Sequence, residues 1–173
     1  MVVDARRPDR VYAATSKGLF RSADGGENWS ALQSIPGESA VLALAPGDRN
    51  ALYAGTPRGA WLSPDDGRTW NPSNTGLVGT SINDLLIPPD NSNALLAATR
   101  SGLAYSPDRG KTWRVIPDLS DNVLTLARDP ALGGNIYAGT VTSAVIVSRD
   151  SGVTFTRLTD NVANAPINSL AIV

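Results

Sequence analysis

Aspartate is the residue type with the greatest capacity for chemistry in this chain, because its 173 residues include no histidine and no cysteine. That composition excludes disulfides, zinc sites of the usual kind, and Ser–His or Cys–His catalytic pairs. A carboxylate can still act as a general acid, a general base or a metal ligand. The first question is therefore which of the fourteen aspartates are free to react.

Four aspartates occupy the same position of an eight-residue segment that recurs along the chain. It reads SADGGENW at 22–29, SPDDGRTW at 63–70, SPDRGKTW at 106–113 and SRDSGVTF at 148–155. The opening serines are separated by 41, 43 and 42 residues. A residue that every repeat contains is better explained as a part of the repeat than as a catalytic or metal-binding group. We therefore expect neither a metal nor a cofactor.

The composition of this segment, called the box below, is that of a tight turn. The carboxylate can accept N–H bonds from its own turn, the glycine can adopt a positive φ, and the terminal aromatic ring can be buried. We interpret the following box residues as structural: Asp24, Gly26, Trp29, Asp65, Gly67, Trp70, Asp108, Gly110, Trp113, Asp150, Gly152 and Phe155.

Two further elements recur in the same order in every repeat. One reads VYAATSKGLF at 11–20, LYAGTPRGAW at 52–61, LLAATRSGLA at 95–104 and IYAGTVTSAVI at 136–146. The other reads VLALA at 41–45, INDLLI at 82–87, VLTLA at 123–127 and INSLAIV at 167–173. With the box, these elements give four short strands in each unit of about 42 residues, which is typical of propeller blades.

We therefore predict an all-β fold, a β-propeller of four-stranded antiparallel blades in one domain over 1–173. The repeats cover approximately 1–40, 41–81, 82–122 and 123–166, and 167–173 is a ring-closing strand. The segment VVDA at 2–5 competes for the same position in the first blade. Residues 167–173 can complete their own ring, complete the ring of a second chain in an eight-bladed homodimer, or belong to a longer propeller. We favour the homodimer, because open blades leave exposed strand edges.

The boxes resemble the BNR or Asp-box repeat of sialidases, xyloglucanase-type glycosidases, sortilin-type receptors and a photosystem II assembly factor. The resemblance covers the whole chain, and three of the four boxes match closely. Asn28 replaces the usual threonine of the first box, Phe155 replaces the tryptophan of the fourth, and Ser143 stands where the other repeats have glycine. The resemblance implies an extracytoplasmic or secreted location, although no signal peptide follows Met1.

Glycoside hydrolysis requires two carboxylates in one cleft, about 5 Å apart in retaining enzymes and about 6.5–9.5 Å apart in inverting ones. A sialidase is not expected. The resemblance would imply a Tyr–Glu pair and an Arg-Ile-Pro motif, whereas the only glutamates are Glu27 and Glu38, and Ile35-Pro36 follows a serine. An aspartate-based glycosidase stays open. Outside the boxes and the predicted turns, its candidate carboxylates are Asp84, Asp118, Asp121 and Asp160.

A ligand site is predicted on the face that carries the loops between the second and third strands and the links between blades. These loops contribute Lys17, Arg58 and Arg100, and Asp84 is the single charge at its position in the innermost strands. Charge on a central strand usually lines water or meets a partner. The predicted ligand-binding residues are therefore Lys17, Arg58, Asp84 and Arg100. Ordinary surface pairing of these cations with Glu38, Asp118 and Asp160 is the alternative.

Overall composition limits the partners. The net charge is −1 and the basic residues are dispersed, so no nucleic-acid partner is expected. No apolar stretch approaches the roughly 20 residues of a membrane span. The leading hypothesis is a non-catalytic propeller scaffold that binds a protein or glycan partner on its loop face. The alternatives are an aspartate-based glycosidase-like propeller, or a fragment of one, and an engineered or excised propeller fragment without its own function.

Overall fold

The computed structural model describes residues 1–4, 6–36, 43–46, 50–77, 80–88, 90–117, 119–132, 134–142, 144–159 and 165–172. Within these ranges, all regular secondary structure is β-strand, and the prediction of an all-β fold is confirmed. No helix in the described part of the chain is long and apolar enough to cross a membrane.

The described residues form sixteen strands in four antiparallel sheets, each of four strands in sequence order. The first sheet contains β1 (Val2–Asp4), β2 (Arg7–Thr15), β3 (Gly18–Ser22) and β4 (Ser30–Ala31). The second contains β5 (Ala43–Pro46), β6 (Leu52–Thr56), β7 (Gly59–Ser63) and β8 (Asn71–Pro72). The third contains β9 (Ile82–Leu86), β10 (Leu95–Thr99), β11 (Gly102–Ser106) and β12 (Arg114–Val115). The fourth contains β13 (Val123–Arg128), β14 (Ile136–Thr140), β15 (Val145–Ser148) and β16 (Thr156–Thr159).

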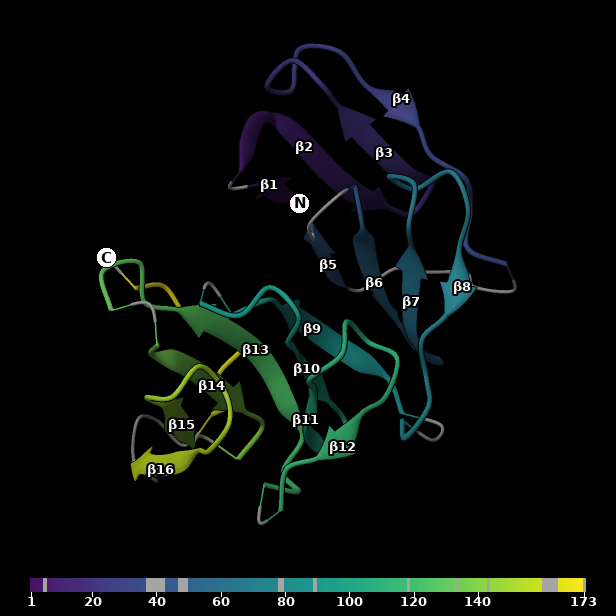
Figure 1. Cartoon of the computed structure of the whole chain (residues 1–173). Coiled ribbons are helices and arrows are strands. Elements are labelled where there is room, and N and C mark those ends of the chain that lie inside the picture. Colours follow the sequence, from purple (N-terminus) through teal and green to yellow (C-terminus); the bar gives the residue numbers. More distant parts are fainter. Residues whose placement is uncertain are drawn as a thin grey trace.

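The four sheets follow one another in an arc, with the first and fourth sheets at its two ends (Figure 1). The first strands of adjacent sheets contact one another, β1 with β5, β5 with β9, and β9 with β13. These strands therefore lie on the inner side of the arc, and the short fourth strands lie outside.

Each junction between adjacent sheets has its own apolar core. Tyr12 and Leu19 pack with Leu52 at the first junction. Tyr53, Ile82 and Leu95 share the second cluster, and the third joins Leu96 and Leu103 to Val123, Ile136 and Ile146. Apolar burial is thus concentrated between the sheets, as expected of a repeat array in which no single unit can bury its faces alone.

A repeated threonine fixes the turn between the second and third strands of each sheet. Thr56 Oγ1 donates a hydrogen bond to the Gly59 carbonyl at 3.0 Å and accepts one from the Arg58 N–H at 3.2 Å. Thr15 and Thr99 make the same pair of bonds. The paired glycine adopts a φ of 129° at Gly59, in the left-handed region that a Cβ disfavours. The Thr-x-x-Gly pattern is therefore a turn requirement.

The two ends of the strands present different loops. The box turns lie beside the loops between first and second strands, since the Asp66 N–H donates to the Asn50 carbonyl at 2.8 Å. The turns between second and third strands lie beside the links between sheets, since the Leu103 N–H donates to the Leu119 carbonyl at 3.3 Å. We call these two ends the box face and the loop face.

The chain termini differ in their pairing. β1 takes the first position of the first sheet, with Val2 opposite Tyr12 and Val3 opposite Val11. Residues 166–172 form no strand, and the Ile167 N–H donates to the Thr140 carbonyl at 3.0 Å at the end of β14. In this chain, the N-terminal segment therefore provides the first strand of the first sheet. Pairing of 167–173 with a second chain stays a prediction.

Candidate functional site

Each box aspartate is a hydrogen-bond acceptor for its own turn. Asp65 Oδ1 accepts the backbone N–H groups of Thr69 at 2.8 Å and Arg68 at 3.1 Å, and Oδ2 accepts the Thr69 hydroxyl at 2.8 Å. The opening serine donates to the same carboxylate and accepts the glycine N–H, at 2.9 and 2.7 Å for Ser63. The carboxylates of Asp24, Asp108 and Asp150 accept corresponding bonds.

These bonds favour the ionised carboxylate. The N–H of Asn28 and the hydroxyl of Ser22 lower the pKa of Asp24 from 3.8 to about 2. The backbone N–H of Thr69 likewise lowers the pKa of Asp65. A carboxylate committed to its turn in this way is a poor general acid near neutral pH.

The aromatic residues of the boxes differ with their place in the arc. Trp70 donates its indole N–H to the Gln33 carbonyl of the preceding sheet at 3.0 Å, and Trp113 donates to the Ser73 carbonyl at 2.8 Å. Both rings are buried. Trp29 belongs to the first described sheet, is 40% exposed and donates to the Gly26 carbonyl of its own turn at 2.9 Å. Phe155 packs against the core of the third junction.

The predicted loop-face residues fall into two groups. Lys17, Arg58 and Arg100 occupy exposed turns of three successive sheets. Asp84 lies on β9, where its carboxylate accepts the N–H groups of Leu85 and Leu126, both at 2.8 Å. Burial raises the pKa of Asp84. Because Leu126 lies on β13, Asp84 ties the third sheet to the fourth, and none of its hydrogen bonds joins it to the three cations.

The remaining candidate carboxylates do not form a described pair. Asp121 accepts Arg157 Nη2 at 2.6 Å and the Thr142 hydroxyl at 2.9 Å. Asp118, Asp160 and Glu38 lie outside the described residues. Among the residues that the structure describes, no group of three acidic side chains is placed to hold a metal ion.

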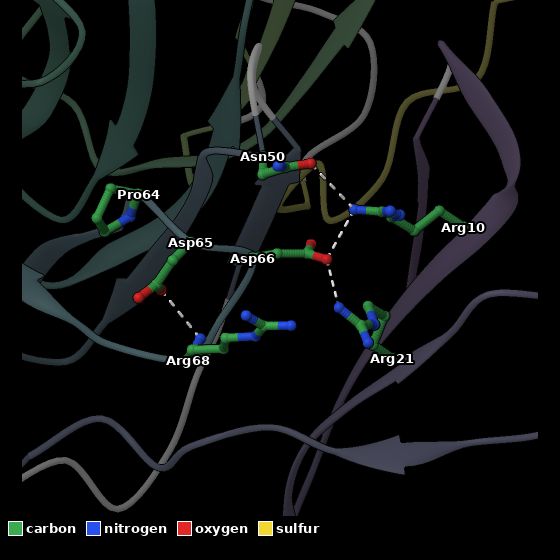
Figure 2. A pocket seen from close by; sticks show the side chains of 7 residues that line it. All are labelled: Arg10, Arg21, Asn50, Pro64, Asp65, Asp66 and Arg68. Atoms are coloured by element: carbon green, nitrogen blue, oxygen red, sulfur yellow. Dashed lines mark hydrogen bonds and ion pairs between the residues drawn. The ribbon is translucent and has the colours of Figure 1, made fainter.

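A pocket of about 400 Å³ lies on the box face between the first and second sheets (Figure 2). We call it the arginine pocket. Its lining residues are Arg10, Arg21, Asn50, Pro64, Asp65, Asp66 and Arg68.

Asp66 is the centre of the arginine pocket. Its Oδ2 accepts Arg10 Nη1 at 2.7 Å and also Arg21 Nη1, while Oδ1 accepts the hydroxyl of Tyr12. Both arginines and Tyr12 come from the first sheet, so one carboxylate in the box of the second blade gathers three donors from its neighbour. Figure 2 shows the two arginines that point toward Asp66. Burial, followed by the hydrogen bond to Asp66, raises the pKa of Tyr12 to about 12.

Sequence reasoning missed this site because its residues are exceptions to the repeat. Asp66 occupies the box position held by Gly25, Arg109 and Ser151, and all four residues have a positive φ. Arg21 stands where β7, β11 and β15 have the uncharged residues Leu62, Tyr105 and Val147. Arg10 corresponds to Ala51, Ala94 and Asn135. Aligning the repeats and marking positions that are charged in one repeat alone would have found Arg10 and Arg21, and Asp66 is the single acidic residue at its box position.

Comparison with protein-family models and with curated protein sequences gave no match. Among solved structures, the chain is similar to an ancestral GH74 enzyme, with a TM-score of 0.76 and 22% identity over 91% of this chain and 23% of that chain. It is similar to YCF48 from Cyanidioschyzon merolae, with a TM-score of 0.61 and 16% identity over 87% of this chain and 56% of that chain. For one chain of a nidogen/laminin complex the TM-score is 0.65 and the identity 13%, over 91% of this chain and 64% of that chain.

This chain therefore spans less than two thirds of each of those chains, and 23% of the GH74 enzyme. At these identities the likeness concerns the fold. The chain has the β-propeller fold, and its four sheets are four blades.

Proposed function

We propose that this chain is a non-catalytic propeller scaffold that binds a protein or glycan partner on its loop face. The main support comes from the turns between second and third strands. In each of the first three turns a threonine and a glycine form a constant frame, and the two residues between them, the tip, vary from blade to blade. The threonine and glycine of each frame recur in the first three blades, whereas the tips read Ser16-Lys17, Pro57-Arg58 and Arg100-Ser101. All six tip residues are exposed. Exposed side chains that vary on a rigid frame are suited to recognition.

The geometry of the carboxylates supports binding over hydrolysis. Asp84 is committed to two backbone N–H groups, and Asp121 is paired with Arg157. A general acid and its partner carboxylate must instead face a substrate across one cleft. The described aspartates outside the boxes offer no such pair. The aspartate-based glycosidase therefore stays the second candidate, and it depends on Asp118 and Asp160.

The structural neighbours are consistent with either role. One is an enzyme of the GH74 group and another belongs to a nidogen/laminin complex. A propeller fold hosts unrelated functions, so function must be argued from the site. For this chain, the loop-face tips carry that argument.

An array of neutral and acidic glycans, probed with the labelled protein, tests the proposal. The variant Lys17→Ala/Arg58→Ala/Arg100→Ala should lose binding, because it removes the cationic tips without altering the frame. A box-face variant, Lys111→Ala/Arg149→Ala, removes exposed cations from the other face and should retain binding. Reducing ends should not accumulate on any bound glycan. Release of sugar, or equal binding by both variants, would contradict the proposal.

A protein partner is tested separately. A photo-crosslinking residue at position 17 or 100, compared with one at position 111, should capture a partner from the loop face alone. The glycan array thus detects a glycan ligand, and crosslinking detects a protein partner. The position of the crosslinking residue shows whether the loop face or the box face is bound.

A further inference from the structure

The arginine pocket holds charge that the propeller fold does not need. At the second and third junctions, the positions equivalent to Arg10 and Arg21 hold Ala51 with Leu62 and Ala94 with Tyr105, all packed in or against the apolar clusters. Two of the three junctions are therefore built without charge at these positions. Blade packing alone does not account for two arginines at the first junction.

The charges in the arginine pocket do not balance. Three guanidinium groups line it, those of Arg10, Arg21 and Arg68. Asp66 presents one carboxylate to two of them, through the single oxygen Oδ2. The carboxylate of Asp65 is already occupied by the N–H groups and hydroxyls of its own turn.

Arg68 supplies the uncompensated charge. Its backbone N–H donates to Asp65, but its guanidinium forms no ion pair within the described part of the chain. Figure 2 shows this side chain extended along the pocket wall, between Asp65 and Arg21. The pocket therefore has an open cationic side.

A second pocket of about 330 Å³ adjoins the first and is lined by Arg21, Ala31, Leu32, Gln33, Gly67 and Arg68. The two pockets share Arg21 and Arg68. Leu32 approaches the box turn closely at Gly67, and the Gln33 N–H donates to the Gly67 carbonyl at 3.1 Å. A ligand that places an anion on the two arginines can thus rest its uncharged part against Leu32 and the turn.

We propose that the arginine pocket binds the carboxylate group of a ligand, held between Arg68 and Arg21. A guanidinium offers two parallel N–H donors that match the two oxygens of a carboxylate. The excess of a single positive charge suits a monoanion better than a phosphate dianion. The site lies on the box face, so it is separate from the loop face of the proposed function.

Such a carboxylate can come from an acidic sugar or from an acidic side chain. Isothermal titration with glucuronate and with N-acetylglutamate distinguishes these sources, and glucose is the neutral control of glucuronate. At least one acid should bind while glucose does not. Binding should weaken as salt is added, because exposed charges are screened.

Variants locate the site. Arg68→Ala should weaken binding by about tenfold or more, the usual range for losing a hydrogen bond to a charged group. Lys111→Ala changes the equivalent position of the third box and should leave affinity unchanged. Arg21→Leu installs the residue type of the next blade and should also weaken binding.

Asp66→Asn separates recognition from a purely structural role. Asparagine tolerates the φ of 65° found at Asp66 and keeps an acceptor for Tyr12, but it removes the competing negative charge. Affinity for the acid should therefore rise several-fold, even if the melting temperature falls. Absence of binding by both acids, equal binding by wild type and Arg68→Ala, or weaker binding by Asp66→Asn with a preserved fold would overturn the proposal.

Discussion

The hydroxyl of Tyr12 on β2 donates a hydrogen bond to Oδ1 of Asp66, in the box of the following blade. The corresponding residue of the second blade, Tyr53, donates to the Arg109 carbonyl of the third box at 3.3 Å. In the third blade the position is Leu96, whose side chain lies against Gly152 of the fourth box. In each of the first three blades, one residue of the second strand therefore reaches the next box, by a charged, a neutral and an apolar contact in turn.

Replacing Tyr12 by phenylalanine should destabilise the protein by about 1–3 kcal/mol, because it leaves one oxygen of the buried Asp66 carboxylate without its donor. Tyr53→Phe is the matched control, and its cost should be at the lower end, near about 0.5–1 kcal/mol, since the lost bond is longer and joins neutral groups. Urea denaturation of the two variants measures the difference. If both variants lost the same free energy of unfolding, the charge of Asp66 would add nothing to the contact.

The box carboxylates make stability depend on pH in the acid range. The turn N–H groups lower the pKa of Asp24 from 3.8 to about 2, so the folded state binds this proton less readily than the unfolded state. The stability contributed is complete above the unfolded pKa and is lost as the pH falls through the folded one. The melting temperature should therefore fall between about pH 4 and about pH 2, and Asp24→Asn should flatten that fall. A melting temperature independent of pH over this range would contradict the prediction.

Asp108→Ala should destabilise the third blade without affecting ligand binding. The change removes the acceptor of the Thr112 N–H at 2.8 Å and of the Ser106 hydroxyl at 2.9 Å. We expect a loss of about 1–3 kcal/mol in denaturant unfolding. Binding of the glycan or acid identified above should be unchanged at temperatures where the variant is folded. Lost binding at an unchanged melting temperature would show that the box is a site.

The repeats made the fold predictable because each blade must satisfy the same turn and packing requirements. The residues Ser63, Asp65, Gly67 and Trp70 of one box predict a local turn, and the recurrence of the box predicts the four sheets that the structure shows. The arginine pocket was not predictable in that way. Asp66 lies beside Asp65 within the box, and only the arrangement of two neighbouring blades brings it to Arg10 and Arg21.

Asp84 shows a second limit of sequence reasoning. Its position on an inner strand indicated a charge facing the loop-face site, whereas its carboxylate accepts the Leu126 N–H of the next blade. The pairing of β13 with β14 is irregular between Val123 and Thr125, and that of β10 with β9 between Ala98 and Thr99. Such irregularities decide which N–H groups are available to a neighbouring side chain, and a repeat pattern does not encode them.

The two end blades expose complementary halves of the contact that joins neighbouring blades. Trp29 of the first blade is 40% exposed, whereas Trp70 and Trp113 donate to carbonyls of the preceding blade. At the other end, Tyr137 is partly exposed and Leu158 is 48% exposed, where a following box would pack. We expect the first blade of a second copy to pack on the fourth blade of this chain, in an eight-bladed ring with a two-fold axis.

We therefore expect a homodimer, with twice the 18.1 kDa mass of one chain by light scattering after size exclusion. Dilution should lower the melting temperature, because association stabilises each chain. Trp29→Glu should yield monomers, since it places a charge in the contact. If residues 167–173 pair across chains, deleting them should also weaken association. A truncated protein that stays a soluble dimer with an unchanged melting temperature would instead show that β1 alone takes the first-strand position. A mass of one chain at every concentration would contradict closure by a second copy.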